Sequence, residues 1–285
     1  MQDKTPNPLS IDEVGPWSEI KLDIIRDYAR EYSKILAAQT NPSFSHVYID
    51  AFAGAGVHFS RTTQQFIPGS PLNAFLVDPP FSEYHLIDIN KGRVENLKSY
   101  STELGKEAFF YNEDCNQVLL NEVFPRVRYE NYRRGLCILD PYGLHLDWEV
   151  IETAGAMGTI EIFLNFPIAD INRNALRKDK EKVEEKQAKR MTRFWGNESW
   201  EKLAYKPSKQ SHLFDPDHEE KVTNQELANA FKERLKKIAG FDFVPDPIPM
   251  KNTIGATVYY LYFASKKAVA QNIVRHIFDK YKNRK

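Results

Sequence analysis

The chain has 285 residues, carries 39 basic and 39 acidic side chains, and is 42% hydrophobic and 13% aromatic. This composition is typical of a soluble globular protein, long enough for one large domain or for a domain with an insertion. The zero net charge argues against a protein coated in nucleic acid, although it allows a local basic patch.

Membrane, secretory and metal-binding classes are not indicated. No apolar run approaches the roughly 20 residues needed to span a bilayer. Residues 1–10 are polar and include two prolines, which is unlike a signal peptide. Two cysteines, Cys115 and Cys137, are too few for a disulfide framework or a cysteine metal cluster. We therefore expect a reducing, cytoplasmic setting.

The first expected elements are a long helix over 17–39 and a buried strand over 47–51, which carries Asp50 at its end. A turn of small residues follows, with Phe52, Gly54 and Gly56. Glycine lets the backbone turn sharply and has no Cβ to hold a ligand away. A strand that ends in such a turn is where α/β folds bind nucleotide-like cofactors.

The turn departs from a dinucleotide-binding fingerprint. Phe59 stands where that fingerprint has a third glycine. The next helix also begins late, at Ser70-Pro71, with serine as the expected N-cap and proline at the first helical position. Residues 57–69 are then expected to form a loop beside the turn, either functional or simply a mobile surface segment.

Three more strands are expected to end on polar residues. The strand over 84–88 ends on Asp88, the strand over 108–111 leads to Asp114 and Cys115, and the strand over 135–140 ends on Asp140. Intervening helices and a fifth strand over 159–166 predict parallel pairing, which gathers the strand ends at one edge of the sheet. Asp88 suits a cofactor ribose. Asp114 could accept a hydrogen bond from an adenine amine, or it or Asn116 could cap the next helix.

A basic segment follows Pro167. Residues 172–193 hold nine Lys or Arg against four Asp or Glu, and Phe194, Trp195 and Trp200 come next. Cations followed by aromatic rings are one pattern of nucleic-acid contact. The same pattern also fits a solvated charged helix with Lys–Glu pairs and an apolar anchor. The candidate nucleic-acid contacts are Arg173, Lys186, Lys189, Arg190 and Arg193.

The remainder of the chain is expected to complete the same fold. A polar loop over 206–220 precedes a helix over 224–239. Strands over 241–244 and 257–264 have no helix between them, so they are expected to pair antiparallel, before a closing helix over 266–281. The predicted fold is α/β and Rossmann-like, one domain over 1–285 with a basic helical insertion at about 168–223.

The ordered set of strand-end residues resembles class I S-adenosylmethionine-dependent methyltransferases. Asp50 to Gly56 looks like their cofactor turn, Asp88 matches the ribose-binding acid, and Asp114 matches the residue beside the adenine. The run 140–143, Asp-Pro-Tyr-Gly, is similar to the Asp/Asn-Pro-Pro-Tyr/Phe signature of methyltransferases acting on exocyclic amines of nucleic-acid bases. Tyr142 replaces the second proline of that signature. The form Asp-Pro-Phe-Gly, found in enzymes that methylate the N2 amine of tRNA guanine, is closer.

About two thirds of the chain also resembles the three-Cys-motif partner protein family (TcmP). The matching stretches are 21–22, 48–54, 69–71, 114–116, 139–143, 166–167 and 172–173. The resemblance implies a bacterial protein with a methyltransferase-like fold, S-adenosylmethionine as cofactor and a neighbouring three-Cys-motif protein as partner. It implies no substrate.

The chemistry expected from the resemblance is direct transfer to an amine. The Asp140 carboxylate and the Pro141 carbonyl would accept hydrogen bonds from the target amine, and Tyr142 could stack on a base. Asp140 could instead be a helix cap. A covalent route through Cys115 is disfavoured, because buried cysteine usually behaves as a small hydrophobe.

Other functional classes remain as alternatives. The chief rival is a catalytically silent methyltransferase-like module that binds a partner protein or a nucleotide without turnover. A nicotinamide-dependent oxidoreductase is disfavoured by Phe59 and the late helix. A hydrolase is disfavoured because the sequence lacks a Gly-x-Ser-x-Gly elbow.

Overall fold

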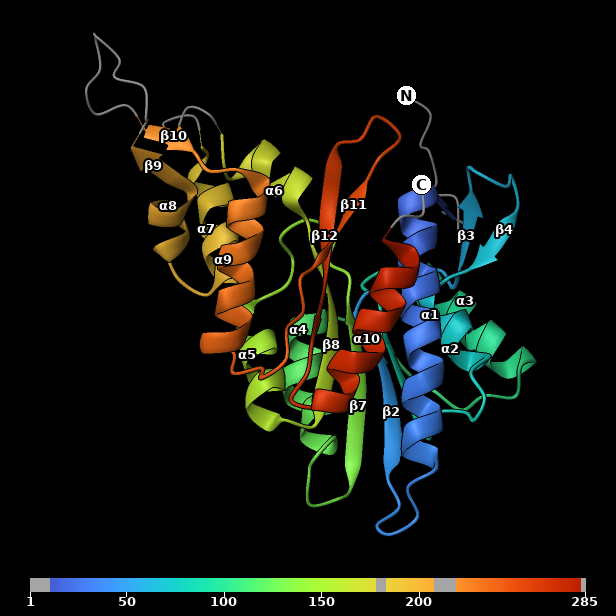
Figure 1. The fold of residues 1–285 in the computed structure, drawn as a ribbon. Helices are drawn as coiled ribbons and strands as arrows, with labels where there is room; N and C mark the ends of the chain where they lie inside the picture. The colour runs from blue at the N-terminus through green and yellow to red at the C-terminus, as the bar shows by residue number, and fades with distance from the viewer. Residues whose placement is uncertain (1–10, 178–182, 208–218, 283–285) are drawn as a thin grey trace, which may run out of the picture.

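The central element of the fold is a seven-stranded sheet. The computed structural model describes residues 11–177, 183–207 and 219–282 (Figure 1). The strand order is β11-β12-β8-β7-β2-β5-β6. Five of these strands are parallel: β2 (Ser45–Asp50), β5 (Glu83–Ile87), β6 (Phe109–Tyr111), β7 (Arg133–Leu139) and β8 (Ile160–Phe166).

An antiparallel pair completes one edge of the sheet. Strand β12 (Thr257–Ala264) runs antiparallel to β8, and β11 (Ile248–Lys251) runs antiparallel to β12. Helices intervene between the parallel strands, so the crossovers place helices on both faces of the sheet. The predicted Rossmann-like fold with an antiparallel C-terminal pair is confirmed.

Side chains of successive strand residues enter two separate cores. In β7, Leu136 and Ile138 face one core, whereas Cys137 and Leu139 face the other. This alternation is the two-residue period of a strand that is buried on both faces. The strands therefore read as continuous apolar runs, which is why the sequence predicts them well.

The first face of the sheet is covered by α1 (Pro16–Ala37), α2 (Ser70–Phe75), α3 (Lys91–Glu103) and α10 (Ala268–Tyr281). Helices α1 and α10 pack side by side in front of the sheet (Figure 1). The second face is covered by α4 (Cys115–Val118), the short π and 3₁₀ turns η1 (Leu119–Val123) and η2 (Phe124–Arg126), α5 (Trp148–Met157) and α9 (Asn224–Lys237). None of the described helices is both long enough and apolar enough to cross a bilayer.

The segment between β8 and α9 forms a group of short elements (Figure 1). It contains α6 (Ile168–Asn174), α7 (Glu185–Trp195), α8 (Ser199–Ala204) and the antiparallel pair β9 (Tyr205–Pro207) and β10 (Glu219–Lys221). Phe194 and Phe231 stack with ring centroids 5.6 Å apart and an interplanar angle of 11°. The apolar side of α7 therefore packs into the core of the second face. The predicted loop over 206–220 lies mostly outside the described residues.

The expectation of a loop over 57–69 is wrong. Strands β3 (Val57–Ser60) and β4 (Phe66–Pro68) form a hairpin there, and β1 (Asp12–Val14) pairs in parallel with β3. Phe59 and Phe66 pack edge to face across the hairpin, 5.4 Å apart. These strands are short, and β1, which pairs with β3, lies more than 40 residues earlier in the chain, so the local sequence carries little signal for them.

The expectation of a strand over 241–244 is also wrong. Within the part of the chain that the structure describes, the one pairing of this segment is a bridge between Phe243 and Ser265. The partner of β12 is instead β11, which contains Pro249. Proline lacks a backbone N–H, but β11 is an edge strand, where that donor is not required. The prolines in and near β11 therefore make its sequence unlike that of a typical strand.

A buried carboxylic acid should make the stability of this fold depend on pH. Glu161 of β8 accepts hydrogen bonds from Tyr28 and Ser265, and burial raises its pKa from 4.5 to about 7. Between those two pKa values the folded state binds more protons than the unfolded state, so stability falls as pH rises through this window. Glu161→Gln, which stays neutral, should gain about 2–3 kcal/mol relative to the natural protein between about pH 5 and about pH 8.

Urea unfolding at both pH values measures this gain. Glu103→Gln is the matched control, because Glu103 is exposed at the end of α3. An equal pH dependence in Glu161→Gln and the natural protein would contradict the assignment.

Candidate active site

The carboxyl ends of the parallel strands surround a cavity of about 870 Å³. Most of the residues predicted from the sequence line it: Phe52, Gly54, Asp88, Asp114, Cys115, Asp140, Pro141, Tyr142 and Arg173. The sequence-predicted residues Asp50 and Gly56 do not line it. Ligand pockets commonly have volumes of about 300–1,000 Å³, so this cavity has room for a cofactor and part of an acceptor.

Asp50 supports the glycine turn of residues 52–56 through hydrogen bonds. Its Oδ2 accepts hydrogen bonds from Tyr48 (3.1 Å) and Ser70 (2.6 Å), and its Oδ1 accepts from the Phe52 amide (3.3 Å). Burial raises the pKa of Asp50 to about 6. The expectation that Ser70 is a helix N-cap is wrong: Gly69 is the N-cap, and the Ser70 hydroxyl is directed to Asp50 instead.

The two glycines of the turn have different roles. Both have left-handed backbone, with φ of +67° at Gly54 and +87° at Gly56. A Cβ on Gly54 would meet no atom within 4 Å, so the backbone there is open to the cavity. A Cβ on Gly56 would lie 2.7 Å from Leu72 Cδ1, so that glycine allows α2 to pack against the turn.

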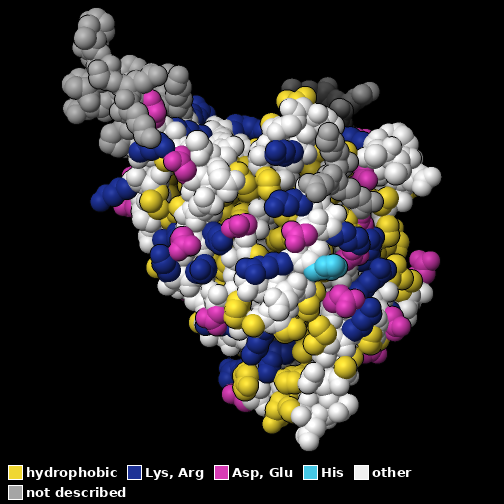
Figure 2. Space-filling model, in the orientation of Figure 1, with side chains coloured by type: hydrophobic (Ala, Val, Ile, Leu, Met, Phe, Trp, Pro, Cys, Tyr) yellow, Lys and Arg dark blue, Asp and Glu magenta, His cyan; other side chains and the backbone are white. Residues whose placement is uncertain are grey.

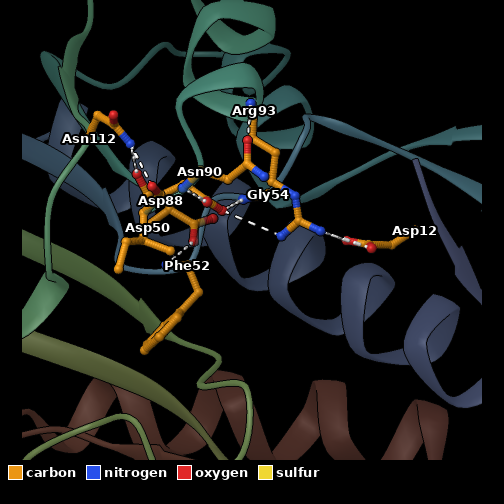
Figure 3. A network of polar contacts seen from close by, with 9 residues as sticks. Asp12, Asp50, Phe52, Gly54, Asp88, Asn90, Arg93 and Asn112 are labelled. Carbon is orange, nitrogen blue, oxygen red and sulfur yellow. Dashed lines mark hydrogen bonds and ion pairs between the residues drawn. The ribbon is translucent and has the colours of Figure 1, made fainter. Parts of the chain in front are cut away.

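Asp88 is held by backbone amides at the edge of the cavity (Figure 3). Its Oδ2 accepts from the Gly54 amide (3.0 Å) and its Oδ1 from the Asn90 amide (2.8 Å). Arg93 lies 3.7 Å from Oδ2 and binds both carboxylate oxygens of Asp12. Each oxygen of Asp88 has a second lone pair, so this fixed carboxylate could still accept bonds from the two hydroxyls of a ribose.

Apolar and polar groups follow along the same wall. Ile89 is 78% exposed and lines the cavity directly after Asp88. Asp114 caps α4, accepting at Oδ1 from the amides of Asn116 (2.9 Å) and Gln117 (3.4 Å). It therefore caps a helix and also lines the cavity; the helix-cap interpretation is confirmed, and the hydrogen bond from an adenine amine stays a prediction.

Cys115 lies beside Asp114 in the cavity wall. Burial raises the pKa of its thiol to about 12. A thiol that stays protonated near neutral pH is a poor nucleophile. This agrees with the expectation that no covalent step passes through Cys115.

Asp140 forms an ion pair with Lys21 of α1. Burial opposes the charge on Lys21, but the interactions with Asp140, Tyr259 and Asp50 together outweigh it and raise the pKa of Lys21 well above its usual value. The pair involves Oδ2 of Asp140, and Oδ1 forms no hydrogen bond among the described residues. Oδ1 is therefore available to a ligand, while Lys21 fixes the orientation of the carboxylate.

The loop after β7 presents its tyrosine to solvent. Pro141 is buried, whereas the Tyr142 ring is 90% exposed and lines the cavity. Gly143 has φ of +65°, and a Cβ there would approach Asp170 Oδ2 to 3.0 Å. The loop thus needs glycine at that position to turn sharply beneath α6.

Two arginines of the basic segment bind groups of the protein. Arg190 donates to His145 Nε2 (2.7 Å), and Arg193 pairs with Asp147 (2.6 Å). Burial, together with the Arg190 charge, lowers the pKa of His145. Because a guanidinium group can only donate, Nε2 of His145 is the acceptor in this contact. Both arginines thereby attach α7 to the loop that leads to α5.

The other basic residues differ in their surroundings. Lys189 pairs with Glu185 (2.6 Å) one turn away on an exposed helix face. Arg173 lines the cavity, and Lys186 is exposed; neither forms a hydrogen bond or ion pair among the described residues. Lys178, Lys180 and Lys182 lie outside the described residues. On the face in Figure 2, basic and acidic side chains are interspersed across the described surface.

Several cavity residues were missed by the sequence interpretation as site residues: Lys21, His58, Asn165 and Tyr259. Lys21 could have been found, because it lies one turn before Ile24 and Ile25 on the buried face of α1. The other three reach the cavity through strand pairing, which a single sequence does not specify. Among the described residues, no group of three or more His, Cys, Asp or Glu side chains is arranged to hold a metal ion.

Comparisons with known proteins agree with the fold. No family model matches the chain, and no curated protein matches it. The solved structure of protein LPL1258 from Legionella pneumophila, assigned to family model DUF519, aligns with a TM-score of 0.50 and 11% identity, covering 92% of each chain. That likeness shows the fold alone.

Two other solved structures are named as methyltransferases. One is an S-adenosylmethionine-dependent methyltransferase from Clostridium acetobutylicum, with a TM-score of 0.42, 11% identity, and coverage of 86% of this chain and 91% of that one. The other is a putative methyltransferase from Escherichia coli, with a TM-score of 0.35, 13% identity, and coverage of 85% and 88%. The strand order and the parallel pairing of the sheet give the protein a Rossmann-like α/β fold. Membership of the three-Cys-motif partner family stays a prediction.

Proposed function

We propose that this protein is an S-adenosylmethionine-dependent methyltransferase that acts on an exocyclic amine of a nucleic-acid base. The observation that supports this most is that Gly54, Asp88, Asp114 and Asp140, from four successive strand ends, line one cavity. In open α/β sheets, ligands bind at the carboxyl ends of the strands.

The chemistry of the cavity wall fits the cofactor. The Asp88 carboxylate suits a ribose diol, and the exposed Ile89 beside it suits the apolar face of a purine. The open backbone at Gly54 allows close approach. When bound, the cofactor supplies an electrophilic methyl group on a sulfonium centre.

Residues of this chain would hold the acceptor amine. Oδ1 of Asp140 accepts one amine hydrogen and the Pro141 carbonyl accepts the other, which directs the nitrogen lone pair to the methyl group. Lys21 keeps the carboxylate oriented through Oδ2. After transfer, the nitrogen carries a positive charge and releases a proton to Asp140 Oδ1.

The exposed Tyr142 ring and nearby cations supply contacts for a nucleic acid. A base can stack on an aromatic ring at the cavity mouth whatever its sequence. Arg173 at the cavity and Lys186 on α7 are positioned for phosphates. We expect Lys189, Arg190 and Arg193 to contribute less, because each already binds a group of the protein.

Removing two cations should weaken nucleic-acid binding. The variant Arg173→Gln/Lys186→Gln should bind single-stranded RNA or DNA less tightly, and its slope of log affinity against log salt should fall by about 1–2. Fluorescence anisotropy over a salt series measures the slope. Lys251→Gln/Arg275→Gln, which removes two exposed cations elsewhere, is the matched control. If the natural protein binds no nucleic acid at low salt, the basic segment is only a solvated face.

The second candidate is a silent binding module that acts with a three-Cys-motif partner protein. The pairing of Asp140 with Lys21 favours it, because that pair already satisfies one oxygen of the proposed catalytic carboxylate. Two measurements separate the candidates: calorimetry with S-adenosylmethionine, and transfer of isotope-labelled methyl to nucleic acid and protein. Binding without transfer, together with co-purification of the partner protein, would favour the module.

A further inference from the structure

Asn165 is a buried amide beside the proposed catalytic carboxylate. It is the second-last residue of β8, and the pairing of Leu139 with Leu164 places the next two residues, Asp140 and Asn165, side by side on neighbouring strands. Leu139 and Leu164 face the core on the α5 side. Because side chains alternate along strands, Asp140 and Asn165 both face α1.

The side-chain oxygen of Asn165 has no hydrogen-bond partner among the described residues. The residue is only 9% exposed, its Oδ1 is buried without a hydrogen bond, and it lines the cavity. A buried polar group without a partner is costly, and in native proteins it calls for an explanation. A ligand in the cavity would supply the missing bonds.

The polar neighbours of Asn165 in the cavity already bind other groups. Lys21 is committed to Asp140, and the Tyr259 hydroxyl donates to the Trp17 carbonyl (3.2 Å). His58 and Arg93 also line the cavity and each has a buried nitrogen without a partner among the described residues, but Asn165 is the one of the three that lies beside Asp140 on the neighbouring strand. The χ2 torsion of Asn165 has a broad range of allowed angles, so either the oxygen or the nitrogen of the amide can face a ligand.

We propose that Asn165 is a specificity-determining residue that reads the edge of the acceptor base, an inference that rests on the proposed function. An amide offers one acceptor and one donor side by side. The matching edge is an exocyclic amine next to an unprotonated ring nitrogen, as in adenine and cytosine. Asp140 Oδ1 holds the first amine hydrogen, and Asn165 Oδ1 shares the second with the Pro141 carbonyl, while Asn165 Nδ2 donates to the ring nitrogen. Thymine has no amine for Asp140.

The experiment measures binding rather than turnover. Fluorescein-labelled oligonucleotides of deoxyadenosine, deoxycytidine or thymidine are titrated against protein saturated with S-adenosylhomocysteine. The natural protein should bind the first two about 10-fold more tightly than the third, as expected for one well-placed bidentate contact. Asn165→Leu should lower this ratio to the part that Asp140 alone supplies, while leaving thymidine binding unchanged. A purely structural role would weaken all three alike.

Two further variants make the result decisive. Asn121→Leu, at an exposed site, should keep the ratio of the natural protein. Asn165→Asp keeps the shape of the side chain but removes the donor. It should also lower the affinity for the deoxyadenosine and deoxycytidine oligonucleotides relative to thymidine, so it tests the inference even if Asn165→Leu does not fold. Failure of the natural protein to bind S-adenosylhomocysteine would overturn the proposed function, and this inference with it. Two outcomes with normal cofactor binding would overturn this inference alone. One is an unchanged affinity ratio in Asn165→Asp, and the other is equal affinity of the natural protein for all three oligonucleotides.

Discussion

Asp140→Asn should lower the rate of methyl transfer by about 10²–10⁴-fold, the usual contribution of a positioned acid–base group. The amide retains the size of the side chain but can no longer take the proton that the amine releases. The affinity for S-adenosylmethionine should stay within about 2-fold, because Asp88 and the Gly54 turn, not Asp140, are proposed to hold the cofactor. Label transferred to total nucleic acid gives the rate, and calorimetry gives the affinity.

The ion pair with Lys21 gives this prediction an internal control. Asp140→Asn leaves a buried ammonium group without its counter-charge, which should cost about 3 kcal/mol of stability. Lys21→Met/Asp140→Asn removes both charges, so it should recover much of that stability and none of the activity. A double variant that transfers methyl groups at the natural rate would remove Asp140 from the mechanism.

Asp88→Asn should weaken binding of S-adenosylhomocysteine by about 100-fold or more. Hydrogen bonds from two ribose hydroxyls to a carboxylate contribute about 1.5–3 kcal/mol each, and an amide provides only one accepting atom. Calorimetry measures the affinity directly and needs no knowledge of the substrate.

The matched control for Asp88 is Asp279→Asn, which changes an exposed carboxylate on α10. It should leave the affinity unchanged. Because Arg93 also lies near Asp88, the thermal stability of Asp88→Asn should be measured alongside. Equal affinity of Asp88→Asn and the natural protein would exclude the ribose assignment.

The sequence predicted the strand ends well because their signal is local. Each parallel strand is an apolar run, and Asp88 and Asp140 follow directly after two of them. The pattern could not separate Asp88 from Asp50, which also ends a strand. They differ because Tyr48 and Ser70 bind the Asp50 carboxylate, a contact that depends on how α2 packs.

The features that the sequence missed depend on distant parts of the chain. Lys21 meets Asp140 across 119 residues, and Asn165 reaches the same place through the register of β7 and β8. The hairpin of β3 and β4 was missed because its pairing with β1 is equally non-local. The charge pattern of the basic segment likewise did not reveal that Arg190 and Arg193 are engaged by His145 and Asp147.

The central claim is tested most directly by incubating the protein with isotope-labelled S-adenosylmethionine and total nucleic acid, then analysing the digested nucleosides and the protein by mass spectrometry. The predicted result is a labelled methyl group on the exocyclic nitrogen of one base, present with the natural protein and greatly reduced with Asp140→Asn. Label on no base, from a protein that calorimetry shows to bind the cofactor, would contradict the account.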